Sequence, residues 1–174
     1  TQRSTSPRTA IASCIAIGHD AQATFSDGVA IGRLSRATTG GAAVAIGLNA
    51  RAPNAHAIAI GDSALANQPQ AIAIGNGAVA NTSATSGVAL GDSAIVTGLR
   101  SVAVGLNANA SGSDSVTIGR ASFAIGASSV AYGWSAVAQG TGSVALGKSA
   151  STVSDTSVAV GSNSATNPVC AVAV

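Results

Sequence analysis

Large aliphatic residues alternate with small residues in short groups that recur along the whole chain. The clearest copy is the segment 101–105, Ser-Val-Ala-Val-Gly, in which two valines flank an alanine and a glycine closes the group. The positions of the closing glycines rise by 14 from each group to the next, except for one step of 15 and one of 16. These glycines are Gly18, Gly32, Gly47, Gly61, Gly75, Gly91, Gly105, Gly119, Gly133, Gly147 and Gly161. A repeat this regular predicts a stack of similar coils, each in contact only with its neighbours.

Each repeat unit divides into two halves of seven. Counted from the glycine as position zero, +11 and +13 hold large aliphatic residues, and +12 is alanine in every copy except Thr117. Positions +3 and +5 hold mostly small residues, and +7 is often glycine. In the segment 122–126, Ser-Phe-Ala-Ile-Gly, the other half carries the same pattern. Alternation over a few residues between turn formers is typical of strands, so we expect an all-β chain with two strands per coil.

The polar residues indicate which side of each strand faces inward. Side chains of a strand point alternately to opposite faces. Positions +4 and +6 include Gln22, Arg36 and Arg51, which are costly to bury without partners. The alanines and serines must therefore fill the interior. The sequence predicts a parallel β-roll with two sheets and an interior thinner than the roughly 10 Å between ordinary stacked sheets.

In this arrangement the aliphatic residues at +11 and +13 point out of their own roll. A fully buried aliphatic side chain contributes about 1.5–3 kcal/mol, and a continuous apolar face of this size does not stay exposed to water on a soluble monomer. We therefore expect an obligate oligomer whose core is formed by this face. The predicted core residues are Ile15, Ile17, Val29, Ile31, Val44, Ile46, Ile58, Ile60, Ile72, Ile74, Val88, Leu90, Val102, Val104, Val116, Ile118, Val130, Tyr132, Val144, Leu146, Val158 and Val160.

Position +4 carries a second, less regular row on the other strand. The row is polar in the first coils and apolar from Leu65 onward, with Asn109 as an interruption. Exposed apolar side chains in a row indicate a ligand-binding stripe. The alternative is that a neighbouring subunit covers this row, which then extends the oligomer core. The residues of the candidate stripe are Leu65, Val79, Ile95, Phe123, Ile125, Trp134 and Val137.

Composition supports a thin repetitive structure. Aromatic residues make up 2% of the chain and charged residues 8%, which is too few for an ordinary globular domain. Apolar residues make up 47%, which is too many for a disordered chain. The net charge is +2, and the seven arginines form no cluster along the sequence, so no nucleic-acid partner is expected. No apolar run reaches the length of a membrane span, and no secretory signal opens the chain.

The sequence offers little for catalysis or metal binding. It has no glutamate, six scattered aspartates and two histidines, His19 and His56. The period of 14 also differs from the 18 expected for three-sided hexapeptide acyltransferase coils. Cys14 and Cys170 lie at opposite ends of the repeats, beyond disulfide reach in an elongated stack, and we expect free thiols. We predict no catalytic residue, no cofactor and no metal.

The repeats run without a domain-sized break. Residues 1–13 lack the repeated group and are expected to form a lead-in segment, and residues 14–174 are expected to form the roll. Two turns are longer than the rest, at 38–43 and 81–87, and we expect both to bulge outward.

The repeated group resembles a known family. Asn or Ser follows two positions after several of the glycines, as at Asn49, Ser63, Asn107 and Ser149. Together with the regular period, this pattern is similar to the head domain of trimeric autotransporter adhesins of the Yersinia adhesin type. The resemblance implies a left-handed parallel β-roll that forms a homotrimer. It also implies display on the outer surface of a Gram-negative bacterium, above a coiled-coil stalk and a β-barrel anchor.

The resemblance also implies a class of function. Heads of this family commonly bind host extracellular matrix proteins such as collagen, fibronectin or laminin, so we expect an adhesin head that attaches to host cells or matrix. The alternative is an inert rigid spacer that holds another adhesive domain away from the cell. The chain is expected to be truncated at its C-terminal end, without neck, stalk or anchor, and to meet a membrane only through the missing anchor.

Overall fold

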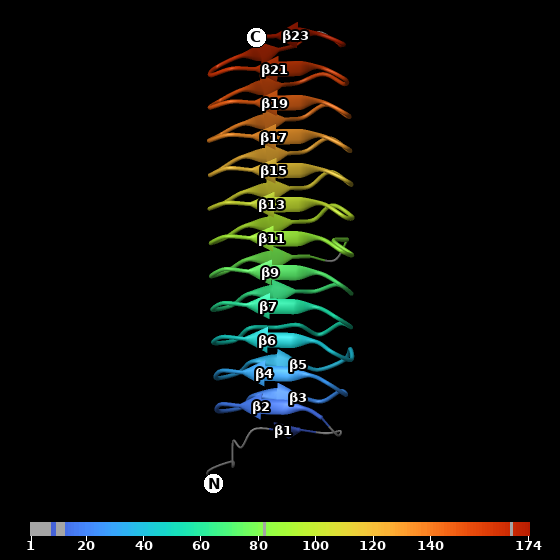
Figure 1. Ribbon diagram of the computed structural model, residues 1–174, viewed down its shortest axis with the longest axis vertical. Helices are drawn as coiled ribbons and strands as arrows, with labels where there is room; N and C mark the ends of the chain where they lie inside the picture. Colours follow the sequence, from blue (N-terminus) through green and yellow to red (C-terminus); the bar gives the residue numbers. More distant parts are fainter. Residues whose placement is uncertain (1–7, 10–12, 82, 168) are drawn as a thin grey trace.

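A computed structural model describes residues 8–9, 13–81, 83–167 and 169–174 as one column of stacked coils (Figure 1). Each coil has two short strands joined by tight turns, and all strand pairs run parallel between successive coils. β1 (Arg8–Thr9) and β23 (Val172–Ala173) lie at opposite ends of the column. The predicted all-β parallel solenoid, with one coil per sequence repeat, is confirmed. Its left-handed sense remains an implication of the resemblance.

The first sheet has twelve strands and consists of the recurring aliphatic groups. The register is fixed by the repeat, so that Val102 lies opposite Val116 and Ala103 opposite Thr117. Each strand between the two ends of the sheet hydrogen-bonds to the equivalent strand of the coils on either side. The strands before β23 are β2 (Ile15–Ile17), β4 (Val29–Ile31), β6 (Val44–Ile46), β7 (Ile58–Ile60), β9 (Ile72–Ile74), β11 (Val88–Leu90), β13 (Val102–Val104), β15 (Val116–Ile118), β17 (Val130–Tyr132), β19 (Val144–Leu146) and β21 (Val158–Val160).

The second sheet is built from the +4 and +5 positions. β1 pairs with β3 (Gln22–Ala23), which pairs with β5 (Arg36–Ala37), so this pairing reaches into the segment before Cys14. Single bridges from Arg36 to Arg51 and from Arg51 to Leu65 continue the sheet to the remaining strands. These are β8 (Leu65–Ala66), β10 (Val79–Ala80), β12 (Ile95–Val96), β14 (Asn109–Ala110), β16 (Phe123–Ala124), β18 (Val137–Ala138), β20 (Ser151–Thr152) and β22 (Ala165–Thr166).

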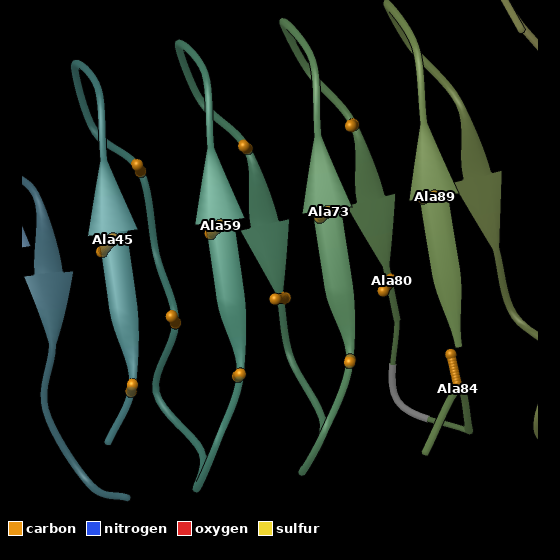
Figure 2. Close-up of a cluster of buried hydrophobic side chains, with 14 of the residues drawn as sticks. Ala45, Ala59, Ala73, Ala80, Ala84 and Ala89 are labelled. Carbon is orange, nitrogen blue, oxygen red and sulfur yellow. The ribbon is translucent and has the colours of Figure 1, made fainter. Parts of the chain in front are cut away.

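Alanines fill the space between the two sheets, as the sequence predicted. Ala45, Ala59, Ala73 and Ala89 occupy equivalent places on successive strands of the first sheet and have no exposed surface (Figure 2). In the part of the chain that the structure describes, the largest fully buried side chain is Val96. The interior therefore has room for methyl groups and little more.

Several interior serines find hydrogen-bond partners within their own turn. The hydroxyl of Ser101, at position +10, donates to the carbonyl of Gly98 at 2.7 Å. The hydroxyl of Ser122, at +3, donates to the carbonyl of Gly119 at 2.8 Å. Both bonds join positions with the same separation along the chain, which shows that the two halves of a coil have the same local geometry. At these positions a serine hydroxyl replaces an alanine methyl and still finds a partner, whereas the buried Oγ of Ser129 has no partner among the described residues.

The turns depend on left-handed backbone conformations. From Gly18 onward each coil has one such residue in each turn, as at Arg100 (φ 52°) and Asn107 (φ 55°). The N–H of Asn107 then donates to the carbonyl of Asp92 in the preceding coil at 2.9 Å. The repeated glycine is under a stronger constraint, since Gly105 has φ 133° and a Cβ there would lie 2.5 Å from the carbonyl oxygen of Gly119. No side chain fits at that position.

The longer turns at 38–43 and 81–87 lie between strands, and the second differs from the expectation that both bulge outward. Among the described residues each turn holds two buried small residues, Gly40 and Ala43 in the first and Ala84 and Gly87 in the second. Ala84 is fully buried, and Figure 2 shows it in the turn that leads to the strand of Ala89. Gly40 is also buried, against the backbone of Asn54 and Ala55. Burial of the Ala84 methyl group is favourable, so this second turn partly folds back onto the coils.

Candidate functional site

The candidate functional surfaces are the outer faces of the two sheets. Within the described ranges, no three histidine, cysteine or aspartate side chains gather in a way that could hold a metal ion. Cys14 directly precedes β2 and Cys170 lies shortly before β23, at opposite ends of the first sheet, and the two are not joined in a disulfide. We therefore consider the surface of the roll as the place where binding occurs.

The outer face of the first sheet carries every residue that was predicted to form the oligomer core. We call this set the aliphatic face. Its members occupy the two outward positions of the strands from β2 to β21, in straight rows that follow the strand register. All of them are half-buried or exposed on the isolated chain, with Ile17 at 57% and Tyr132 at 56% exposure. The structure thus brings these residues together on one surface and leaves that surface uncovered.

The backbone holds these rows rigidly. The N–H of Val102 donates to the carbonyl of Ser115 at 2.9 Å, and the N–H of Gly105 donates to the carbonyl of Leu90 at 2.8 Å. Hydrogen bonds of this kind join each coil to both neighbours, so equivalent side chains repeat at the spacing of paired strands, about 4.8 Å. A flat apolar surface with fixed spacing favours packing against an identical surface.

The outer face of the second sheet carries the candidate stripe. Leu65, Val79, Ile95, Asn109, Phe123 and Val137 lie opposite one another in adjacent strands from β8 to β18. Ile95 and Phe123 are each 37% exposed. Ile125 follows Phe123 in the next outward position and is also exposed, whereas Leu65, Val79 and Val137 are half-buried. Asn109 interrupts the row, and its buried Oδ1 has no hydrogen-bond partner among the described residues.

Trp134 lies in a turn beside the stripe and not in its row. The Nζ of Lys148, one coil further along, lies 4.8 Å from the centroid of the Trp134 ring. Such a cation–π contact at an exposed site contributes about 0.5–1 kcal/mol. Sequence reasoning missed Lys148, although its place one repeat after Trp134 was the available signal.

The opposite turns carry one well-formed ion pair. Arg100 donates to both carboxylate oxygens of Asp114 in the next coil, at 2.7 and 2.8 Å. The hydrogen bonds from Arg100 hold the pKa of the Asp114 carboxyl below its usual range. Both side chains are well exposed, so the pair has little effect on the stability of the fold.

Comparison with protein families identifies the repeat. The YadA head domain repeat (2 copies) matches residues 15–35, 39–64, 52–78, 66–94, 83–108, 97–122 and 138–164. The chain belongs to the YadA head family. This match confirms the resemblance inferred from the repeated sequence pattern. A comparison with curated proteins finds no match.

Membership in the YadA head family has direct consequences. The YadA head is a non-catalytic structural domain of trimeric autotransporter adhesins, so the expectation of no enzyme activity is confirmed. Adhesin heads of this family are homotrimeric and are exposed on the surface of Gram-negative bacteria. In the part of the chain that the structure describes, no helix is long and apolar enough to cross a membrane.

Proposed function

We propose that this chain forms a homotrimeric head that attaches a Gram-negative bacterium to host cells or to extracellular matrix proteins such as collagen, fibronectin or laminin. Family membership supports the class of protein, and the outer faces of the roll support the two parts of the function. In this proposal the first sheet assembles the head and the second sheet meets the ligand.

One observation carries the proposal: the aliphatic face stays uncovered while alanines fill the interior. Ala103 has no exposed surface, whereas its neighbours Val102 and Val104 are half-buried and point the other way. The same burial pattern recurs in most strands of the first sheet. An apolar surface of this size and regularity is unfavourable in water, and a symmetric contact with identical chains would bury it.

The candidate stripe is the proposed ligand contact. Ile95, Phe123 and Ile125 are exposed in rows held by the strand register, so they offer a rigid apolar surface along the column. Apolar and aromatic anchors of this kind are typical centres of protein interfaces. An extended protein such as collagen could contact several coils at once. The competing interpretation assigns the same row to the contact between subunits.

The Ile95→Ser/Phe123→Ser double variant tests the stripe. We expect it to lose most binding to whichever of immobilised collagen, fibronectin and laminin the unmodified chain binds, with little change in melting temperature. A matched control is Phe25→Ser/Leu34→Ser, which removes two exposed apolar side chains from turns of the first coils, away from the stripe, and should retain binding. Binding is measured in a solid-phase assay, and melting by circular dichroism.

Two results would contradict this assignment. A large fall in melting temperature in Ile95→Ser/Phe123→Ser, with loss of assembly, assigns the stripe to the subunit interface. If the unmodified trimer binds none of the three matrix proteins and no host cells, the chain is a rigid spacer and the adhesive function is wrong.

A further inference from the structure

The first coils carry a row of arginines on the outer face of the second sheet. Arg36 and Arg51 are a full coil apart in the sequence but lie directly opposite each other in adjacent strands, and both are exposed. Gln22 precedes them in the same row. All three residues share the +4 position of the repeat, so they lie in one row although they are 14 and 15 residues apart along the chain.

The backbone fixes the spacing of these side chains. The N–H of Arg36 donates to the carbonyl of Ala50, and the carbonyl of Arg36 accepts from the N–H of Ala52, both at 2.8 Å. The N–H of Arg51 donates to the carbonyl of Ala64 at 2.9 Å. These backbone hydrogen bonds hold the two arginines at the spacing of paired strands, about 4.8 Å.

Among the described residues, no carboxylate forms an ion pair with this row. The ion pairs there are His19–Asp20 and Arg100–Asp114, and neither involves Arg36 or Arg51. Like charges opposite each other on a sheet are destabilising, so a bound anion would relieve their repulsion.

Charge is also uneven along the part of the column that the structure describes. Its residues before Gly61 include four arginines and two aspartates, whereas those from Gly61 onward include three cations and four aspartates. Positive charge therefore gathers at the end of the column that carries the two arginines, and this distribution attracts a polyanion to the first coils.

We propose that Arg36 and Arg51, with Arg33 in the adjoining turn, form a binding site for a sulfated polysaccharide. The guanidinium group presents a planar pair of donors that matches tetrahedral oxyanions, and its charge does not depend on pH in the ordinary range. A linear polymer with closely spaced sulfates matches a rigid row of cations along the column. The row itself, Gln22, Arg36 and Arg51, has no aromatic side chain, which disfavours single-stranded nucleic acid because its bases require stacking partners.

This inference goes beyond the proposed function, since it adds a second class of ligand at coils that precede the apolar stripe. It does not require the trimer, although three copies of the row in a trimer would strengthen binding through multivalency. The oligomeric state is therefore measured separately on the same samples by sedimentation. A monomer that binds heparin through these arginines supports the site and contradicts the trimer. A trimer that does not bind heparin supports the assembly and contradicts the site.

The test measures binding of heparin to the unmodified chain and to Arg36→Ser/Arg51→Ser by fluorescence anisotropy at several salt concentrations. We expect salt-sensitive binding that falls about tenfold in the double variant. Arg36→Lys/Arg51→Lys should bind heparin with an affinity between these two, since the charge is kept but the paired guanidinium donors are lost. The matched control is Arg100→Ser/Arg120→Ser, which removes the same net charge from elsewhere on the surface and should change binding by less than about twofold.

Three results would overturn the proposal. Failure of the unmodified chain to bind heparin removes the site. An equal loss in both serine double variants shows an effect of net charge alone. If hyaluronan, which has carboxylates but no sulfates, or single-stranded DNA binds as tightly as heparin through the same arginines, the ligand class is wrong.

Discussion

The two sheets of the roll have nearly the same backbone but different outer faces. Both pair in parallel from coil to coil, and both direct alanine or another small residue inward. On the first sheet the outward residues are aliphatic in every strand, with Tyr132 as the exception. On the second sheet they change along the column, from Arg36 through Leu65 to Ser151.

This difference separates the demands of folding from those of recognition. The interior admits only small side chains, so both sheets meet the same requirement there. Outside, nothing in the single chain requires a uniform row of valine and isoleucine, and the uniformity of the first sheet therefore indicates a contact that repeats in every coil. The variation on the second sheet is what a surface that meets a particular ligand at particular coils requires.

The largest expected effect comes from a charge on the aliphatic face. Val102→Asp places equivalent carboxylates together near the proposed subunit contact, where burial and mutual repulsion oppose assembly. We expect the trimer to be lost, as measured by sedimentation velocity. Ile95→Asp is the matched change on the second sheet and should leave the trimer intact. If both variants or neither lose the trimer, the proposed difference between the two faces is wrong.

A smaller effect is expected from overfilling the interior. Ala103 is fully buried between the sheets, and Ala103→Leu should destabilise each chain by about 1–3 kcal/mol or more, because the surroundings have no space for the added atoms. Chemical denaturation monitored by circular dichroism measures the change. Val102→Ile adds a methylene on the outward side of the same strand and serves as the control. A neutral Ala103→Leu would contradict the inward assignment.

The smallest effect is expected at the Arg100–Asp114 pair, which lies in the turns and on neither face. Since the pKa of Asp114 in the folded chain lies below its unfolded value of about 3.9, the pair stabilises the fold above that pH. The stabilisation is lost as the pH falls through the folded-state pKa. We expect the unmodified chain to melt at a slightly higher temperature than Asp114→Asn at neutral pH, and the difference to shrink as the pH falls below the unfolded-state pKa. If the difference in melting temperature instead grows as the pH falls, the stabilising role of the ionised Asp114 is contradicted.

Much of the fold follows from the repeat alone. The regular period, the alternation in residues 102–104 and the costly burial of Arg36 and Arg51 were sufficient to predict two parallel sheets with alanine inside. These features are predictable because every coil repeats the same physical constraint. The trimer and the left-handed sense of the coils rest on family resemblance and remain predictions.

Other features could not be read in the same way. Left-handed turn residues include Arg100 and Thr156, whose side chains do not favour that conformation, so only the position in the repeat predicts it. The burial of Ala84 depends on how an inserted turn folds back. The row that brings Arg36 opposite Arg51 follows from their shared +4 position in the repeat. The contact of Lys148 with Trp134 was missed, because two side chains 14 residues apart meet only between adjacent coils.

The oligomeric state of the unmodified chain tests the central claim most directly. Sedimentation equilibrium over a wide range of concentrations should give a single species at three times the chain mass of 16.4 kDa, without dissociation until the chain unfolds. A folded monomer of 16.4 kDa that stays soluble with its aliphatic face exposed would contradict the account.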